Sequence, residues 1–191
     1  MALKLSTGLV NALLKTGSFK SVMNDGILYF YSGLQPANAD AIETAGAICL
    51  LKVTVASGAF VSGAPTNGLG WDDAVLNVAS KAAAETWSGV GLVDGTAGWF
   101  RFYGNTVVTG ASTSAIRFDG RVSATGGGGE IELSYPGISL GATTTITAAT
   151  FTIPLSGITI CISLSTQANS FACGRYFSVI LKVSTLARFF M

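Results

Sequence analysis

The sequence predicts an all-β fold, an antiparallel β-sandwich that is jelly-roll-like and carries a short N-terminal helical arm. Three observations favour this class. Apolar and polar residues alternate with a period of two more often than with the helical period of 3.6. Clusters of glycine, asparagine, aspartate and proline separate the alternating runs at short intervals. No long helical run is present that could connect the parallel strands of an α/β fold.

Residues 1–25 are expected to form the helical arm. Leu5, Leu9 and Leu13 recur at four-residue spacing and would place one apolar stripe along a helix. An isolated helix of about ten residues is marginal in water. This helix must therefore dock, either on the β core of its own chain or on a neighbouring molecule.

Residues 26–156 are expected to form the sandwich, with at least seven strands. The first strand, Ile27–Tyr31, follows a turn of asparagine, aspartate and glycine. Charged and apolar residues alternate in Trp99–Tyr103 and Ile116–Val122, a pattern typical of half-buried strands. Further runs with strand periodicity are Glu130–Tyr135, Thr144–Leu155 and Ile158–Leu164.

Two glycine-containing turns connect these runs. The Asp94-Gly95 pair predicts a tight hairpin between Val90–Val93 and Ala97–Tyr103. The four glycines Gly126–Gly129 are interpreted as a flexible hairpin tip. A phosphate-binding loop would need a lysine, a serine or threonine and then a helix, whereas strand-period residues follow here.

Residues 157–191 are expected to be an apolar C-terminal extension, acting as a strand or a clamp. Ile158–Leu164 alternates as a strand, polar residues follow, and the chain ends on an apolar cluster with Phe189 and Phe190. No window reaches the roughly 18 continuous apolar residues of a transmembrane helix, so no membrane association is expected.

The composition indicates a subunit of an assembly. Only 11% of the residues are charged and 49% are hydrophobic, whereas charged residues usually make up about a quarter. A surface with so few charges is a liability for a free monomer, which suggests that other subunits cover it. The 11 basic and 10 acidic residues give a net charge of +1, so direct nucleic-acid binding is not expected.

Residues with catalytic or metal-binding chemistry are scarce. The chain contains no histidine, which removes the usual general base at neutral pH and histidine-based zinc sites. Glu130 and Glu132 share a strand face, but their alternating context favours a solvated face over a glycosidase pair. Asn38 and Asp40 resemble a fragment of a calcium loop, yet further oxygen ligands are missing, which favours an exposed turn. We predict no catalytic residue, no cofactor site and no metal site.

The cysteines and the aromatic residues fit a packed core. Cys49, Cys161 and Cys173 have no metal-type spacing, and their odd number does not indicate a disulfide framework. Such thiols usually act as small buried hydrophobes and fit a reducing site of assembly. The aromatic strand Trp99–Tyr103 could stack on sugars, but its alternation favours packing in the core.

Three segments carry a resemblance to a known family. They are LSTGLVNALLKTGSFKSVMNDGILYFYSGLQPANADA (Leu5–Ala41), ETWSG (Glu85–Gly89) and GTAGWFRFYG (Gly95–Gly104). Together they resemble small structural proteins of tailed-bacteriophage virions, over Leu5 to about Leu155. The resemblance implies a β-rich virion protein without enzymatic activity, and we expect a capsid decoration or cement subunit that stabilises contacts between major capsid proteins.

The expected partners are the major capsid protein and further copies of this chain, in a virion assembled in the cytoplasm of a bacterial host. A tail, collar or head-to-tail joining component is the alternative, and a carbohydrate-binding module on the particle surface is another. The candidate interface residues are apolar side chains of the arm and the extension: Leu5, Leu9, Leu13, Phe19, Phe189 and Phe190.

Overall fold

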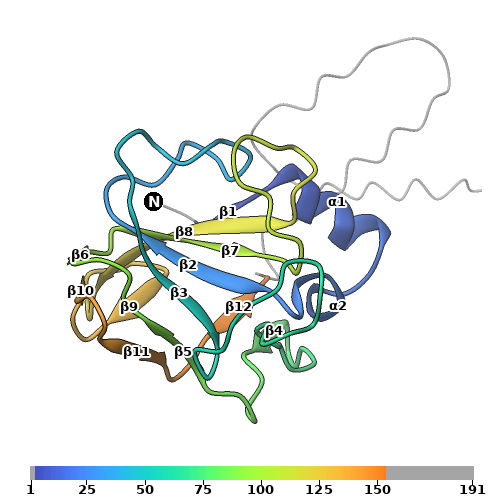
Figure 1. The fold of residues 1–191 in the computed structure, drawn as a ribbon. Helices are drawn as coiled ribbons and strands as arrows, with labels where there is room; N and C mark the ends of the chain where they lie inside the picture. The colour runs from blue at the N-terminus through green and yellow to red at the C-terminus, as the bar shows by residue number, and fades with distance from the viewer. Residues whose placement is uncertain (1–2, 154–191) are drawn as a thin grey trace, which may run out of the picture. The chain divides into compact units, whose positions relative to one another are not determined.

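The computed structural model describes residues 3–153 of the chain, and this part is an all-β fold with two short helices (Figure 1). The predicted class is therefore confirmed. The elements are β1 (Lys4–Leu5), α1 (Thr7–Lys15), α2 (Phe19–Met23), β2 (Ile27–Tyr31), β3 (Cys49–Val55), β4 (Val78–Ser80), β5 (Trp87–Val90), β6 (Gly95–Thr96), β7 (Trp99–Tyr103), β8 (Arg117–Ala124), β9 (Ile131–Leu133), β10 (Gly137–Ile138), β11 (Thr143–Ile146) and β12 (Thr150–Thr152).

One sheet of eight strands dominates the fold. Its order is β1-β8-β7-β2-β3-β5-β11, and β9 also pairs with β8. Every pairing is antiparallel except β8 with β9, which is parallel. Two further pairs, β10 with β6 and β12 with β4, form separate two-stranded sheets. This arrangement does not confirm the jelly-roll topology, in which two sheets are connected by Greek keys.

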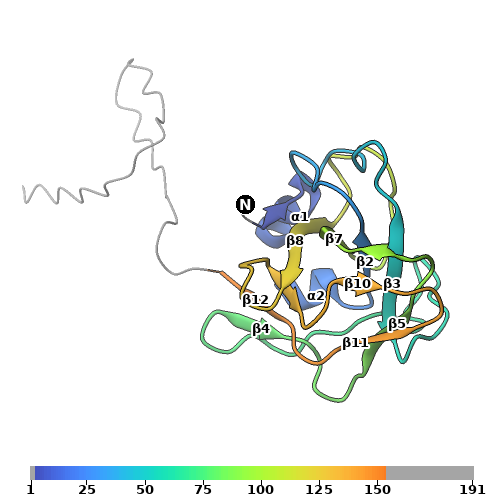
Figure 2. The ribbon, with the colours of Figure 1, turned by 90° about the vertical axis from the view of Figure 1, so that its left-hand side faces the viewer.

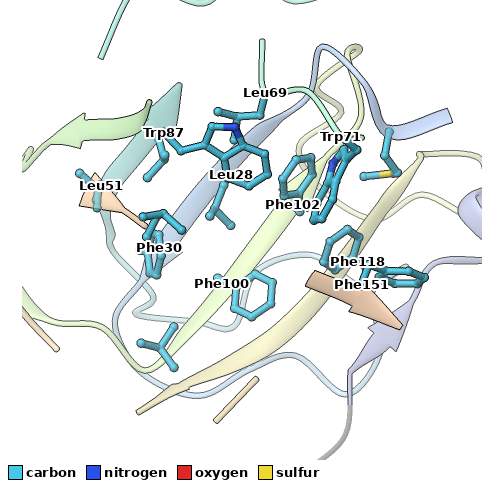
Figure 3. Close-up of a cluster of buried hydrophobic side chains, with 14 of the residues drawn as sticks. Leu28, Phe30, Leu51, Leu69, Trp71, Trp87, Phe100, Phe102, Phe118 and Phe151 are labelled. Carbon is cyan, nitrogen blue, oxygen red and sulfur yellow. The ribbon is translucent and has the colours of Figure 1, made fainter. Parts of the chain in front are cut away.

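The long sheet curls around a single hydrophobic core (Figures 1 and 2). Because side chains alternate along a strand, Leu28, Phe100 and Phe102 point to the inner face, and residues of β5, β11 and β12 contribute from other sides. The aromatic rings pack in specific geometries: Phe102 stacks on Phe118 with ring centroids 5.3 Å apart. Figure 3 shows the centre of this cluster, with Leu28, Phe30, Leu51, Leu69, Trp71, Trp87, Phe100, Phe102, Phe118 and Phe151.

The helices belong to the same compact unit as the sheet, which spans residues 1–152. Ser6 caps α1, because its Oγ accepts a hydrogen bond from the backbone N–H of Leu9 at 3.1 Å. Leu9 is fully buried in the core, and Leu13 packs against the core while partly exposed. Of the two docking partners that the sequence left open, the structure places the helix on its own core, so residues 1–25 are no separate arm.

The outer face of the sheet is also covered, which differs from the expectation of half-buried strands. All five residues of β7 are buried, and so are the first four of β8. Two loops lie over this face. We name them the first covering loop, residues 32–48 between β2 and β3, and the second covering loop, residues 104–116 between β7 and β8.

Neither of the two predicted hairpins forms. Strand β5 pairs with β3 and β11, and β7 pairs with β2 and β8, so Asp94 and Gly95 connect strands that are not neighbours. Gly126–Gly129 connects the parallel strands β8 and β9. Gly126 and Gly128 have φ angles of +81° and +69°, which glycine adopts readily. The Glu132 carboxylate accepts hydrogen bonds from both of their backbone N–H groups and so fixes this turn.

Candidate functional site

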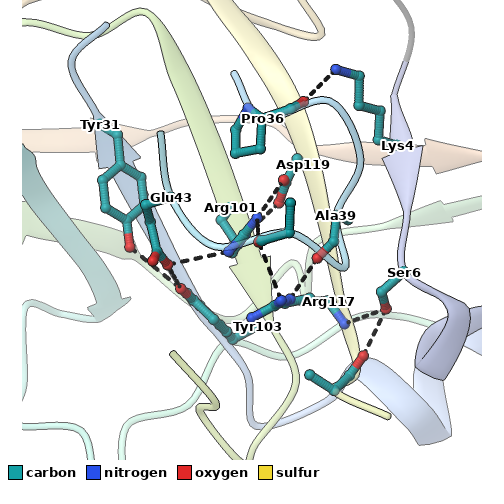
Figure 4. Close-up of polar contacts among 12 residues, drawn as sticks. Lys4, Ser6, Tyr31, Pro36, Ala39, Glu43, Arg101, Tyr103, Arg117 and Asp119 are labelled. Atoms are coloured by element: carbon teal, nitrogen blue, oxygen red, sulfur yellow. Dashed lines mark hydrogen bonds and ion pairs between the residues drawn. The ribbon is translucent and has the colours of Figure 1, made fainter. Parts of the chain in front are cut away.

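Charged side chains are buried on the outer face of the sheet, under the two covering loops. Arg101, Arg117 and Asp119 are completely inaccessible to solvent. The antiparallel register of β7 and β8 places Arg101 opposite Asp119. We name this group the arginine cluster; its members are Tyr31, Glu43, Arg101, Tyr103, Arg117 and Asp119 (Figure 4).

Arg101 forms a two-pronged ion pair with Asp119. Its Nε donates to Asp119 Oδ1 at 2.6 Å and its Nη2 to Asp119 Oδ2 at 2.7 Å. The remaining Nη1 donates to Glu43 Oε1 at 3.1 Å, and Nη2 also reaches the carbonyl oxygen of Ala41 at 3.0 Å. Burial by itself lowers the pKa of Arg101, but the hydrogen bonds and the charge of Asp119 raise it above its ordinary value. The guanidinium is therefore charged, and each of its three nitrogens is hydrogen-bonded.

Arg117 binds only backbone carbonyl oxygens. Its Nε donates to Ala39 at 2.6 Å, and Nη2 donates to Asp40 at 3.0 Å, so one end of the guanidinium holds the first covering loop. Nη1 donates to Val108 at 2.7 Å and Nη2 to Gly110 at 2.8 Å, which holds the second covering loop. Burial and the nearby Arg101 charge lower the pKa of Arg117. One side chain thus ties both loops to β8.

Helix α1 is connected to the first covering loop through Asp40. Its carboxylate accepts from the backbone N–H of Thr7 at 2.9 Å and from the Thr7 hydroxyl at 2.6 Å. A carboxylate at the first turn of a helix is favourable because the N–H groups there lack intrahelical partners. Asp40 therefore acts in helix capping. No group of three or more possible metal ligands occurs among the residues that the structure describes.

Two tyrosines close the cluster on the side of Glu43. The Tyr103 hydroxyl donates to Glu43 Oε1 at 3.0 Å, and the hydroxyls of Tyr31 and Tyr103 are 3.3 Å apart. Burial raises the pKa of Tyr103 to about 12. Burial and the neighbouring Tyr103 raise the pKa of Tyr31 as well. Both phenols therefore stay protonated far into the alkaline range.

The raised pKa values of Tyr31 and Tyr103 predict that the protein loses stability in alkali. Unfolded tyrosines ionise near pH 10, whereas Tyr103 in the folded chain keeps its proton up to about pH 12. As the pH rises, the unfolded state loses the phenolic proton first. The free energy of unfolding should therefore be unaffected below about pH 9 and fall between about pH 10 and 12. The fall should be about 3 kcal/mol for Tyr103. Urea unfolding at a series of pH values measures this fall.

The matched variants separate the buried phenols from the exposed one. Tyr31→Phe/Tyr103→Phe should flatten the alkaline part of the stability profile. Tyr135→Phe should leave it unchanged, because the Tyr135 side chain is 75% exposed. An equal slope in the double variant and in the unchanged chain would contradict the assignment.

The arginine cluster has the character of a structural clamp. Each guanidinium group is bound by carboxylate or carbonyl oxygens of the same chain. Arg101, Arg117 and Asp119 lie under the two covering loops and have no exposed surface.

On the opposite side of the sheet the hydrophobic core opens into a cavity of about 850 Å³, a volume typical of binding sites. We name it the core cavity. Its walls are residues 130–135, with β9, and residues 142–152, with β11 and β12. Its floor is formed by apolar side chains of the core: Leu28, Trp71, Trp87, Phe100, Phe102 and Phe118.

The walls of the core cavity contain two unpaired strand edges. Within residues 3–153, β9 pairs only with β8, and β11 pairs only with β5. Trp71 is 4% exposed, and its Nε1 has no hydrogen-bond partner in the described part of the chain. Buried polar groups are normally paired; this nitrogen is enclosed by the packed core.

The structure distributes the predicted interface residues over different environments. Leu9 and Phe19 are in the core and thus are not on the surface of this chain. Leu5 and Leu13 are partly exposed. Phe189 and Phe190 lie outside the described residues.

The other sequence candidates have structural roles as well. Glu130 accepts from the backbone N–H of Arg121, and Glu132 holds the glycine turn. The four aromatic rings of β7 are buried, so this strand presents no platform for sugars. No helix in the described part of the chain is long and apolar enough to span a membrane.

The sequence interpretation missed the arginine cluster, although a signal for it exists. Trp99 and Tyr103 share a strand face with Arg101, while Phe100 and Phe102 occupy the other. Large aromatic residues on both faces of a strand indicate that both faces are covered. Charged residues in such a strand must then be buried and paired.

The fold and the two sites define a small all-β protein with a buried ionic clamp and an open core. Comparison with models of protein families, with curated proteins and with solved structures finds no match for this chain.

Proposed function

We propose that this chain is a non-enzymatic structural subunit of a bacteriophage virion, a capsid decoration or cement subunit that stabilises contacts between major capsid proteins. The observation that carries the proposal is the use of the charged side chains. They fix the loops of the chain itself, and the outer surface keeps large apolar groups.

Nine acidic side chains bind groups of the same chain: Asp40, Glu43, Asp72, Asp73, Glu85, Asp94, Asp119, Glu130 and Glu132. Six of them accept from backbone N–H groups: Asp40, Asp72, Glu85, Asp94, Glu130 and Glu132. Glu85, for example, accepts from the N–H of Gly70 and from Trp87 Nε1, both at 2.8 Å. Such contacts rigidify a scaffold, which supports a structural role over hydrolytic chemistry.

The surface carries large apolar side chains in several places. Leu14, Leu34 and Leu76 are 83%, 76% and 87% exposed, and Leu140 is exposed as well. Single exposed apolar residues are normal. Together with a charged fraction of only 11%, however, they favour a subunit whose surface is covered in an assembly. The resemblance of the three segments to phage virion proteins supports the same class.

A subunit of this kind stabilises a shell by mass action. It binds the assembled lattice and not the separate capsid proteins, so its binding free energy adds to the cost of opening the lattice. Apolar surface buried at each contact contributes roughly 25 cal/mol per Å². A rigid subunit loses little conformational entropy when it binds, which the clamped loops favour.

The proposal predicts that shells lacking this chain open at a lower temperature than complete particles. Adding back the purified chain should restore the opening temperature, measured by release of the genome on heating. The Leu9→Asp variant, which loses a core residue, should not restore it. Absence of the chain from purified particles would contradict the proposal.

The copy number per particle distinguishes a decoration subunit from the alternative, a tail, collar or head-to-tail joining component. Quantitative mass spectrometry of purified particles should find hundreds of copies for a decoration subunit. A few to a few dozen copies would favour the joining region instead. The free strand edges of the core cavity suit contacts in either place.

A further inference from the structure

We propose that the core cavity receives residues 158–164 of a second copy of this chain, as an added strand that completes the sheet. The choice of a second copy as donor rests on the proposed function, because an assembly needs contacts that join copies. The proposal is argued from the strand edges, from the lining of the cavity and from the sequence of the donor segment.

The two free edges run in opposite directions. Five antiparallel steps lead from β8 through β7, β2, β3 and β5 to β11, so β11 runs opposite to β8. Strand β9 is parallel to β8 and therefore also opposite to β11. An extended segment lying between β9 and β11 can offer backbone N–H and C=O groups to both edges. Strand addition of this kind is a general mode of peptide recognition.

The lining of the core cavity requires an occupant with one apolar face. Its floor is aromatic and aliphatic, with Trp71, Trp87 and Phe102 among its residues. Threonines of β11 and of the segment after it line the opening. The occupant must therefore bury apolar groups toward the floor and present small polar groups toward solvent.

Residues 158–164 match this requirement in sequence. Ile158, Ile160, Ile162 and Leu164 share one face of an extended chain, and Thr159, Cys161 and Ser163 share the other. The segment contains no charge and no proline, so nothing in it opposes burial or backbone pairing. It lies in the 38 residues that follow Ile153, the last described residue, beside the Thr150–Thr152 wall of the cavity.

The first experiment changes the donor segment in the full-length chain. Sedimentation velocity over a dilution series measures self-association. The unchanged chain should form a discrete oligomer that dissociates on dilution. Ile160→Asp should weaken the association about tenfold or more, because it places a charge in the apolar cavity. Thr159→Asp, on the opposite face of the same strand, should change it by about twofold at most.

The second experiment changes the receptor. Thr144 lines the core cavity and shares a strand face with the buried Ile146, whereas Thr113 is an exposed threonine of the second covering loop and does not line the cavity. Thr144→Trp should fill part of the core cavity and weaken self-association to the extent of Ile160→Asp. Thr113→Trp should leave it within about twofold of the unchanged chain. Circular dichroism confirms that the variants retain their β structure.

Three results would overturn the proposal. They are a chain that stays monomeric at every concentration, equal association of Ile160→Asp and the unchanged chain, and equal association of Thr144→Trp and Thr113→Trp. All measurements use purified protein without particles. A failure here therefore leaves the virion role standing, and absence of the chain from particles leaves the strand exchange standing.

Discussion

Arg101→Met is expected to lower the free energy of unfolding by about 3–5 kcal/mol, because it leaves the Asp119 carboxylate buried without its partner. Asp119 is fully inaccessible, and the only cation that binds its two oxygens directly among the described residues is Arg101. The substitution also removes one hydrogen bond to Glu43 and one to the carbonyl oxygen of Ala41. Urea unfolding followed by tryptophan fluorescence measures the loss.

Two further variants test the physical reason. Arg101→Met/Asp119→Leu removes both charges and should recover much of the stability, since buried pairs can be replaced by apolar groups at little cost. Lys52→Met removes an exposed cation from the neighbouring sheet surface and should change stability by less than about 0.5 kcal/mol. If Arg101→Met proved as mild as Lys52→Met, the ion pair would not hold the covering loops.

Leu9→Asp is expected to unfold the compact unit, at a cost above about 4 kcal/mol. Leu9 is completely buried, and no cation lies beside it in the core cluster of the described residues. Leu14→Asp, in the same helix, is the control: this side chain is 83% exposed, and its replacement should leave the thermal midpoint nearly unchanged. Differential scanning calorimetry compares the two.

An unchanged thermal midpoint of Leu9→Asp would contradict this expectation. It would mean that α1 is not part of the folding unit. The segment before β2 would then behave as the detachable arm that its length suggests, and Leu9 would again be available for contacts with another subunit.

Local patterns were sufficient to predict the first helix and several strands, among them β2, β7, β8 and β9, but not the partners of these strands. The alternation in Trp99–Tyr103 predicts β7, and the leucine spacing around Leu9 predicts α1. The Asp94-Gly95 pair satisfies the local rule for a tight hairpin, yet β5 and β7 are separated in the sheet by β3 and β2. Turn chemistry describes how the chain can bend, whereas sheet order depends on contacts between distant segments.

The candidate sites show the same limit. The burial of Arg101 depends on two loops that lie over β7, and their carbonyl oxygens carry no signal in the amino-acid sequence. The core cavity depends on which strand edges stay unpaired, and this follows from the complete topology. The donor segment, in contrast, can be identified from sequence, because a period of two is a local property.

The contacts of Arg117 have a consequence for how the surface of this protein can change. The hydrogen bonds of this guanidinium to Ala39, Val108 and Gly110 use main-chain oxygens and no side-chain atom of the loops. The outward residues of the covering loops, such as Leu34, can therefore be exchanged while the loops keep their path. A binding face can diversify here by mutation, or be redesigned, on an unaltered framework.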